Sequence, residues 1–196
     1  MILTIGHSNH EVAQFIGRLV QHEITAVADV RSSPHSGRFP QYCKNAIRDS
    51  LHEVGIAYVF LGDVLGGRPA ADLVSPEGFA DYPRMARQPF FLSGLGRLKQ
   101  GADRYQLAMM CAEADPADCH RALLIGRQLA ACGLPVEHIH RDGSIESHSK
   151  LEDRLLTLAS LGHEDLFSTL GERIDAAYRH RAARFAWRPE MPEVEE

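Results

Sequence analysis

The sequence lacks long apolar runs, paired cysteines and an excess of positive charge. No stretch approaches the roughly 18 to 20 apolar residues of a membrane span, so we expect no membrane partner. The first residues have neither the basic start nor the apolar run of a signal peptide, which favours a cytoplasmic protein. In that reducing compartment the four cysteines are expected to be free thiols.

The balance of charge excludes a general polycation. Lys and Arg number 21 against 26 Asp and Glu, which gives a net charge of -5. A nucleic-acid partner would therefore need a local basic patch. The length of 196 residues and the hydrophobic share of 44% suit one globular domain with one substantial core.

Short apolar runs alternate with segments of helical periodicity. The expected strands are 2–6, 25–30, 56–60, 105–111 and 136–139, and the expected helices are 12–20, 46–54, 90–98, 117–132, 151–161 and 166–185. This alternation predicts an α/β fold, with a mostly parallel sheet of about five strands, helices on both faces and additional C-terminal helices. Within a single domain over 1–196, we expect a core over 1–146, a C-terminal helical appendage over 147–189 and an acidic tail over 190–196.

Ionisable or nucleophilic residues follow four of the five expected strands. They are His7 and Ser8 after the first strand, Asp29 and Arg31 after the second, Cys111 and Glu113 after the fourth, and His138 and His140 after the fifth. Ligands of open parallel sheets bind beyond the carboxyl ends of the strands. The sequence therefore predicts a site at this edge of the sheet.

The segment 111–121 carries the densest group of such residues. Asp115 suits the N-cap of a helix and Pro116 its first position, and Cys119, His120 and Arg121 follow. A helix dipole disfavours cations at that point. Either a bound anion is held there by helix N–H groups and Arg121, or Arg121 pairs with a neighbouring acid, namely Glu113, Asp115 or Asp118.

The two cysteines of this segment have two interpretations. A thiol near a helix N-terminus and a His-Arg pair can have a lowered pKa and act as a nucleophile, although Glu113 would raise the pKa of Cys111. Alternatively both are buried and inert. We expect no metal, because the spacing of Cys111, Cys119 and His120 matches no standard zinc module.

Two further segments could bring basic groups to the site. Residues 31–48 contain Arg31 and Arg38 and no acid, and Phe39 and Tyr42 could stack on a base or tuck into the core. The Gly-Gly turn before Arg68 is either a lid that carries this arginine to the site or a plain loop.

Several separated motifs together resemble the family called domain of unknown function 488. They are Thr4-Ile5-Gly6-His7-Ser8, Asp29-Val30-Arg31, Leu65-Gly66-Gly67, Cys111-x-Glu113 and Cys119-His120-Arg121, within a likeness that spans roughly residues 2–160. The resemblance implies an α/β fold and a prokaryotic cytosolic protein, and it supplies no reaction. A weaker likeness in layout is to rhodanese-like domains, from which the chain departs because ten positions separate Cys111 from Arg121.

Three functional hypotheses follow. The first is an enzyme acting on an anionic small molecule or nucleic acid, whose phosphate the arginines hold. Asp29 or Glu113 is then the acid or base, and His7 or His120 moves a proton. Cys111 or Cys119 is the nucleophile. The substrate-binding residues are then His7, Ser8, Arg31, Arg38, Arg68 and Arg121. The second is a binding module with the same pocket, and the third is a thiol or sulfur-transfer protein. The sequence names no cofactor and is compatible with a homodimer.

Overall fold

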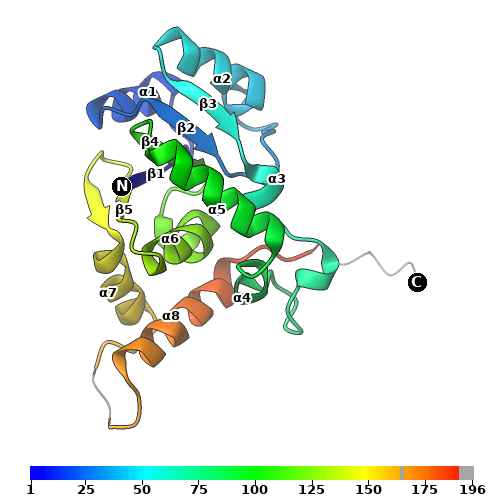
Figure 1. The fold of residues 1–196 in the computed structure, drawn as a ribbon, viewed down its shortest axis with the longest axis vertical. Coiled ribbons are helices and arrows are strands. Elements are labelled where there is room, and N and C mark those ends of the chain that lie inside the picture. Colours follow the sequence, from blue (N-terminus) through cyan, green and yellow to red (C-terminus); the bar gives the residue numbers. More distant parts are fainter. Residues whose placement is uncertain (164–165, 190–196) are drawn as a thin grey trace.

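The computed structural model describes residues 1–163 and 166–189. Its centre is a six-stranded sheet in the order β3-β2-β4-β1-β5-β6 (Figure 1). The strands are β1 (Ile2–Gly6), β2 (Ala26–Asp29), β3 (Ala57–Phe60), β4 (Leu107–Cys111), β5 (Val136–Ile139) and β6 (Ile145–Ser147). All neighbouring pairs are parallel except β5 and β6, which are antiparallel. The predicted α/β class is confirmed.

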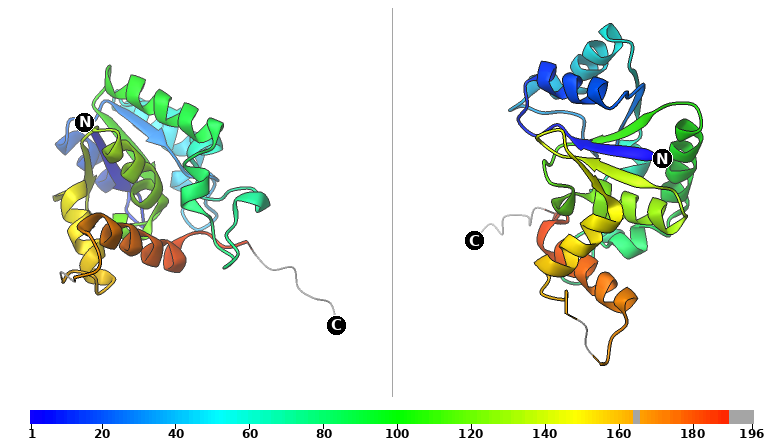
Figure 2. Two further views of the ribbon diagram at one scale, coloured as in Figure 1. Left: turned by 60° about the horizontal axis from the view of Figure 1, so that its bottom comes forward. Right: turned by 90° about the vertical axis from the view of Figure 1, so that its left-hand side faces the viewer.

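Helices cover both faces of this sheet, as Figure 2 shows in two further views. The helices are α1 (Val12–Gln21), α2 (Lys44–Glu53), α3 (Gly62–Leu65), α4 (Tyr82–Met85), α5 (Pro89–Ala102), α6 (Arg127–Ala131), α7 (His148–Leu158) and α8 (Leu170–Phe185). Apolar side chains of α1 and α2 form one buried cluster with one face of the sheet. Those of α5, α6, α7 and α8 form a larger cluster with the other face.

The two clusters follow from the alternation of side chains along each strand. In β1, Leu3 and Ile5 belong to the cluster of α1 and α2, whereas Ile2 belongs to the cluster of α5 and α6. Every residue of β1 and β4 is buried, which is why these strands are nearly continuous apolar runs in the sequence.

The structure departs from the predicted elements in several places. The short helices α3 and α4 lie where no element was predicted, and α8 begins at Leu170 rather than at residue 166. The sixth strand, β6, has three residues and follows a turn at Gly143, which has a φ of +88°, so it is too short to stand out by periodicity. The helix predicted over 117–132 is broken into a 3-10 turn (Pro116–Asp118), a π-helical turn (Arg121–Gly126) and α6. The acidic tail predicted over 190–196 lies outside the described residues.

Among residues 1–163 and 166–189, no helix is both long enough and apolar enough to cross a membrane.

Candidate functional site

The carboxyl ends of β1 and β4 lie side by side at the centre of the sheet, where Gly6 pairs with Cys111. The chain leaves β1 toward β2 and leaves β4 in the opposite direction, toward β5. This reversal is a topological switch point, the place where open α/β sheets bind ligands. The predicted edge of the sheet is therefore also the edge that its topology leaves open.

A cavity of about 600 Å³ lies at this edge. Its walls come from the loops after β1, β2 and β4, together with Arg68 and Arg141. Of the residues singled out in the sequence, it is lined by His7, Ser8, Arg31, Arg38, Arg68, Cys111 and Glu113. Asp29, Cys119, His120 and Arg121 do not line it.

Asp29 forms an ion pair with Arg31 and does not line the cavity. Its carboxylate is fully buried and accepts two hydrogen bonds from the Arg31 side chain, from Nε at 2.9 Å and from Nη2 at 2.6 Å. The hydroxyl of Tyr58 donates to the same carboxylate at 2.8 Å. Arg31 Nη1 donates to the carbonyl of Tyr42 at 2.8 Å. This arrangement makes Asp29 a positioning residue and leaves it poorly placed as the predicted acid or base.

His7 is held as a neutral ring under the cavity. Its Nδ1 lies 2.9 Å from the carbonyl of Ser8, to which it donates, and its Nε2 accepts from Arg31 Nη1 at 3.2 Å. Burial and the charge of Arg31 lower the pKa of His7 to about 4. The ring of Tyr42 stacks on it with centroids 4.1 Å apart. Tyr42 is thus part of the core, and of the two predicted stacking aromatics only Phe39 borders the cavity.

Two thiols, a carboxylate and an imidazole meet beneath the cavity. The Glu113 Oε2 atom lies 3.0 Å from Cys111 Sγ and 2.9 Å from Cys119 Sγ. The Nδ1 atom of His120 lies 3.6 and 3.8 Å from the same two sulfur atoms. All four donor atoms lie within 4.8 Å of one another, and these residues could hold a metal ion.

The two thiols have opposite pKa shifts. Burial and the neighbouring Cys119 raise the pKa of Cys111 well above its ordinary value, and Glu113 adds to this, as its charge predicts. Burial also acts to raise the pKa of Cys119, but the hydrogen bond from Cys111 and the charges of Arg121 and His120 bring it well below its ordinary value. Cys119 is therefore the thiol of the pair that loses its proton first.

Arg121 points into the protein and not into the cavity. Its side chain is fully buried and donates to the carbonyls of Glu113 and Ala114, at 2.7 and 3.0 Å, and to Thr4 Oγ1 at 3.4 Å. The predicted pairing with an acid is not seen among the described residues, and the side chain does not line the cavity. The acids at positions 115 and 118 pair with Arg154 and Arg181 instead.

The family comparison covers most of this site. A family model described as domain of unknown function DUF488 matches residues 11–127, a segment that includes β2, β4 and the cluster of thiols. The chain belongs to the DUF488 family. Neither the curated proteins nor the solved structures gave a match.

The DUF488 chain also contains a buried polar relay that sequence reasoning found only in part. From Arg121, the relay runs through Thr4, His138, His148 and Tyr178 to Glu152, with distances of 3.4, 2.8, 3.0, 2.9 and 3.1 Å. The Tyr178 hydroxyl has one proton, which it donates to the Glu152 carboxylate, so it accepts from His148 Nε2. His148 Nδ1 then accepts from His138 Nε2, and His138 Nδ1 accepts from the Thr4 hydroxyl, which fixes one tautomer for each histidine. Arg121 and His138 had a signal in the sequence, and Thr4 lay in a family motif. His148 and Glu152 lie one turn apart on α7 and Tyr178 lies on α8, and no motif pointed to Glu152 or Tyr178.

Gly66-Gly67 in this DUF488 chain is a close-packed turn. A Cβ atom at Gly67 would lie 2.7 Å from Cγ of the His120 ring, and one at Gly66 would lie 2.4 Å from the carbonyl oxygen of Gly62. This close packing leaves no room for a side chain at either position, and Arg68, which follows the turn, lines the cavity.

Gly67→Ala is expected to lower the free energy of unfolding by about 2 kcal/mol, because the added methyl group overpacks the His120 ring. Urea unfolding followed by circular dichroism measures this change. Gly96→Ala is the matched control, since a Cβ there meets nothing within 4 Å inside α5 and the change should stabilise by about 0.5–1 kcal/mol. Equal effects of the two substitutions would contradict the packing argument.

Proposed function

We propose that this DUF488 protein binds a phosphate-bearing small molecule in the cavity at the carboxyl edge of the sheet. The observation that carries the proposal is a group of arginines without acidic partners. Arg38, Arg68 and Arg141 line the cavity, and none forms an ion pair with a carboxylate of the described residues. A guanidinium that has no carboxylate partner is suited to bidentate contact with phosphate oxygens.

The charge of the cavity wall favours an anion. Four arginines line the cavity, counting Arg31, and Glu113 is the one carboxylate among its lining residues. Arg31 is neutralised by Asp29, so the uncompensated positive charge lies with the three exposed arginines. Their charge attracts a phosphate group, and salt weakens that attraction because the groups face solvent.

The size and the aromatic wall of the cavity support a nucleotide as the type of ligand. A volume of about 600 Å³ falls within the usual range of about 300–1,000 Å³ for small-molecule sites. Phe39 is half-buried at its wall, beside the arginines, where a base could stack on the ring. Hydroxyl groups of Ser8, Ser32 and Ser36 add donors for phosphate oxygens.

Arg38→Ala and Arg68→Ala are each expected to weaken binding of adenosine diphosphate by about tenfold, because each removes a charge-assisted hydrogen bond to phosphate. Isothermal titration calorimetry at low and at raised salt measures the affinity and its dependence on salt. Arg104→Ala is the control: Arg104 is also exposed but lies three residues before the start of β4, at the opposite edge of the sheet. Unchanged affinity in the two cavity variants would overturn the proposal, as would the same loss in the control.

A further inference from the structure

We propose that Cys111, Glu113, Cys119 and His120 form a binding site for one divalent transition-metal ion, with zinc as the expected ion. The proposal goes beyond the phosphate site and does not depend on it. It rests on four features of the described residues: the spacing of the donor atoms, the orientation of the imidazole, the balance of charge and the access to solvent.

The spacing of the donor atoms approaches that of a tetrahedral site. With Zn–S distances of about 2.3 Å and a Zn–N distance of about 2.0 Å, sulfur and nitrogen lie about 3.5 Å apart. His120 Nδ1 lies 3.6 Å from Cys111 Sγ and 3.8 Å from Cys119 Sγ. Glu113 Oε2 lies closer, 3.0 and 2.9 Å from the sulfur atoms, so binding an ion requires its carboxylate to withdraw by about 0.5 Å.

The groups around the donors hold them as the surroundings of a metal site do. The Nε2 atom of His120 donates to the carbonyl of Val30 at 2.9 Å, which leaves the Nδ1 lone pair directed at the two thiols. The backbone N–H of Arg121 donates to Cys119 Sγ at 3.4 Å. Gly67 packs so closely against the imidazole ring that an added Cβ would lie 2.7 Å from its Cγ atom. The imidazole is therefore preorganised, with its tautomer set by a backbone carbonyl.

The buried guanidinium of Arg121 fits a site of net negative charge. It is fully buried, and it has no carboxylate within ion-pair distance among the described residues. A buried charge requires compensation. Two thiolates, one carboxylate and a neutral imidazole around a dication carry a net charge of about -1, which balances one guanidinium.

The ligand types select a borderline-soft ion. Thiolate and imidazole ligands suit zinc and neighbouring first-row ions, whereas magnesium and calcium prefer oxygen. The ion would lie within reach of added ligands, because Cys111 and Glu113 border the phosphate cavity. Glu113 and His120 also border a second cavity of about 220 Å³. An ion here could therefore meet an oxygen atom of a ligand bound in the phosphate cavity.

The direct test uses the full chain, purified without an affinity tag, reduced and freed of metal with a chelator. Cobalt(II) and zinc(II) are then added in the absence of phosphate, so that the outcome is separate from anion binding. We expect one ion per chain by elemental analysis, thiolate-to-cobalt charge-transfer bands and the visible bands of tetrahedral cobalt. A fold that is intact by circular dichroism but binds no cobalt or zinc would overturn the proposal.

Substitutions assign the ligands. Cys119→Ser is expected to weaken cobalt binding by about a hundredfold or more and to reduce the charge-transfer band, and Glu113→Gln, which keeps the shape of the side chain, to weaken it by at least about tenfold. Cys132→Ser is the control, because this cysteine is exposed at the end of α6. If Cys119→Ser does not fold, the Glu113→Gln variant decides. Full cobalt affinity in Glu113→Gln would exclude the four-residue site.

Discussion

Replacement of Arg121 by leucine is expected to lower the free energy of unfolding by about 4 kcal/mol. The guanidinium is the donor for the carbonyls of Glu113 and Ala114 and for the hydroxyl of Thr4. Leucine fills part of the space but leaves two buried carbonyls without a partner, and each such group costs about 1–3 kcal/mol. Urea unfolding followed by circular dichroism and by the fluorescence of Trp187 measures the loss.

Two comparisons separate hydrogen bonding from the simple loss of a large side chain. Arg121→Lys keeps the charge but offers fewer directed donors. Its free energy of unfolding should therefore lie between that of the wild type and that of the leucine variant. Arg104→Leu, at an exposed position, should change stability by less than about 0.5 kcal/mol. A leucine variant at position 121 as stable as the wild type would show that the two carbonyls find other donors.

Acidification from pH 7 to pH 4 is expected to lower the free energy of unfolding by about 3 kcal/mol through His148 alone. Burial and the charge of Arg127 lower the pKa of His148 to about 4 in the folded protein, against 6.5 when unfolded. The unfolded chain therefore binds more protons than the folded chain between these values, so stability falls as the pH falls through this range. One pKa unit corresponds to about 1.4 kcal/mol.

The surroundings of His148 explain why it stays neutral. His138 lies against it from β5, Tyr178 from α8, Arg127 from α6 and Glu146 from β6, and only Glu146 favours the charged ring. The pKa of His138 is also lowered, so the two rings act in the same direction. A second proton on His148 would occupy Nδ1, which accepts the hydrogen bond from His138 Nε2, and would break the polar relay there.

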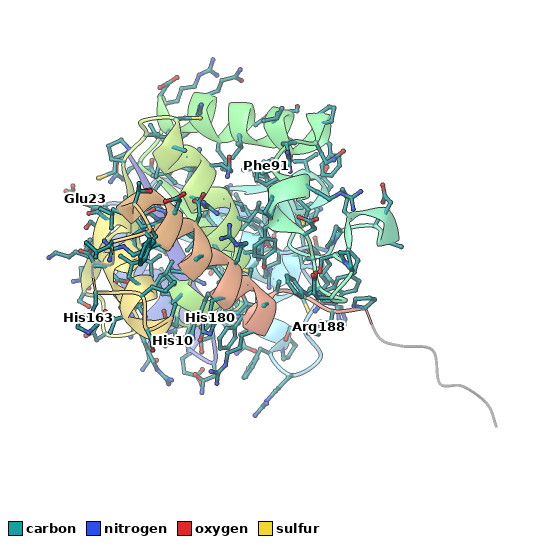
Figure 3. All side chains as sticks on the ribbon, turned by 90° about the horizontal axis from the view of Figure 1, so that it is seen from below. His10, Glu23, Phe91, His163, His180 and Arg188 are labelled. Atoms are coloured by element: carbon teal, nitrogen blue, oxygen red, sulfur yellow. The ribbon has the colours of Figure 1, made fainter. Side chains whose placement is uncertain are left out.

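The measurement is urea unfolding at a series of pH values between 7 and 4. His148→Gln should make the dependence on pH less steep, by up to about 1.4 kcal/mol per pH unit for the one proton removed. His163→Gln and His180→Gln are controls, since both residues are exposed; they are labelled in Figure 3. An equally steep dependence in His148→Gln would mean that other groups account for the acid sensitivity.

Much of the fold could be predicted from the sequence because the central parallel strands β1, β2 and β4 are buried on both faces. Their apolar runs and the helical periodicity between them gave the α/β class and the C-terminal helices, and the DUF488 resemblance is confirmed by the family match. The principle that sites lie at the carboxyl ends of strands brought out His7, Arg31, Cys111 and Glu113, all of which border one cavity.

The sequence did not predict that Cys111, Glu113, Cys119 and His120 come together, or that the Arg121 side chain points into the protein. Zinc modules are recognised by short spacings along the chain, and here the 3-10 turn between Glu113 and Cys119 folds the donors back on one another. The direction of the Arg121 side chain depends on the π-helical turn, where the periodicity of an α-helix gives the wrong face. The prediction that Arg121 holds an anion assumed one regular helix after Asp115, and that helix is broken into separate turns.

The fixed direction of the polar relay has a consequence for how the sequence can change in evolution. Each inner member of the chain from Arg121 to Glu152 accepts from one neighbour and donates to the next, so an apolar substitution at one position leaves two neighbours unsatisfied. Relatives that differ at one of these positions should differ at a neighbouring one as well. The exposed arginines of the cavity form no ion pair within the described residues, so a change at one of them leaves no buried neighbour without a partner.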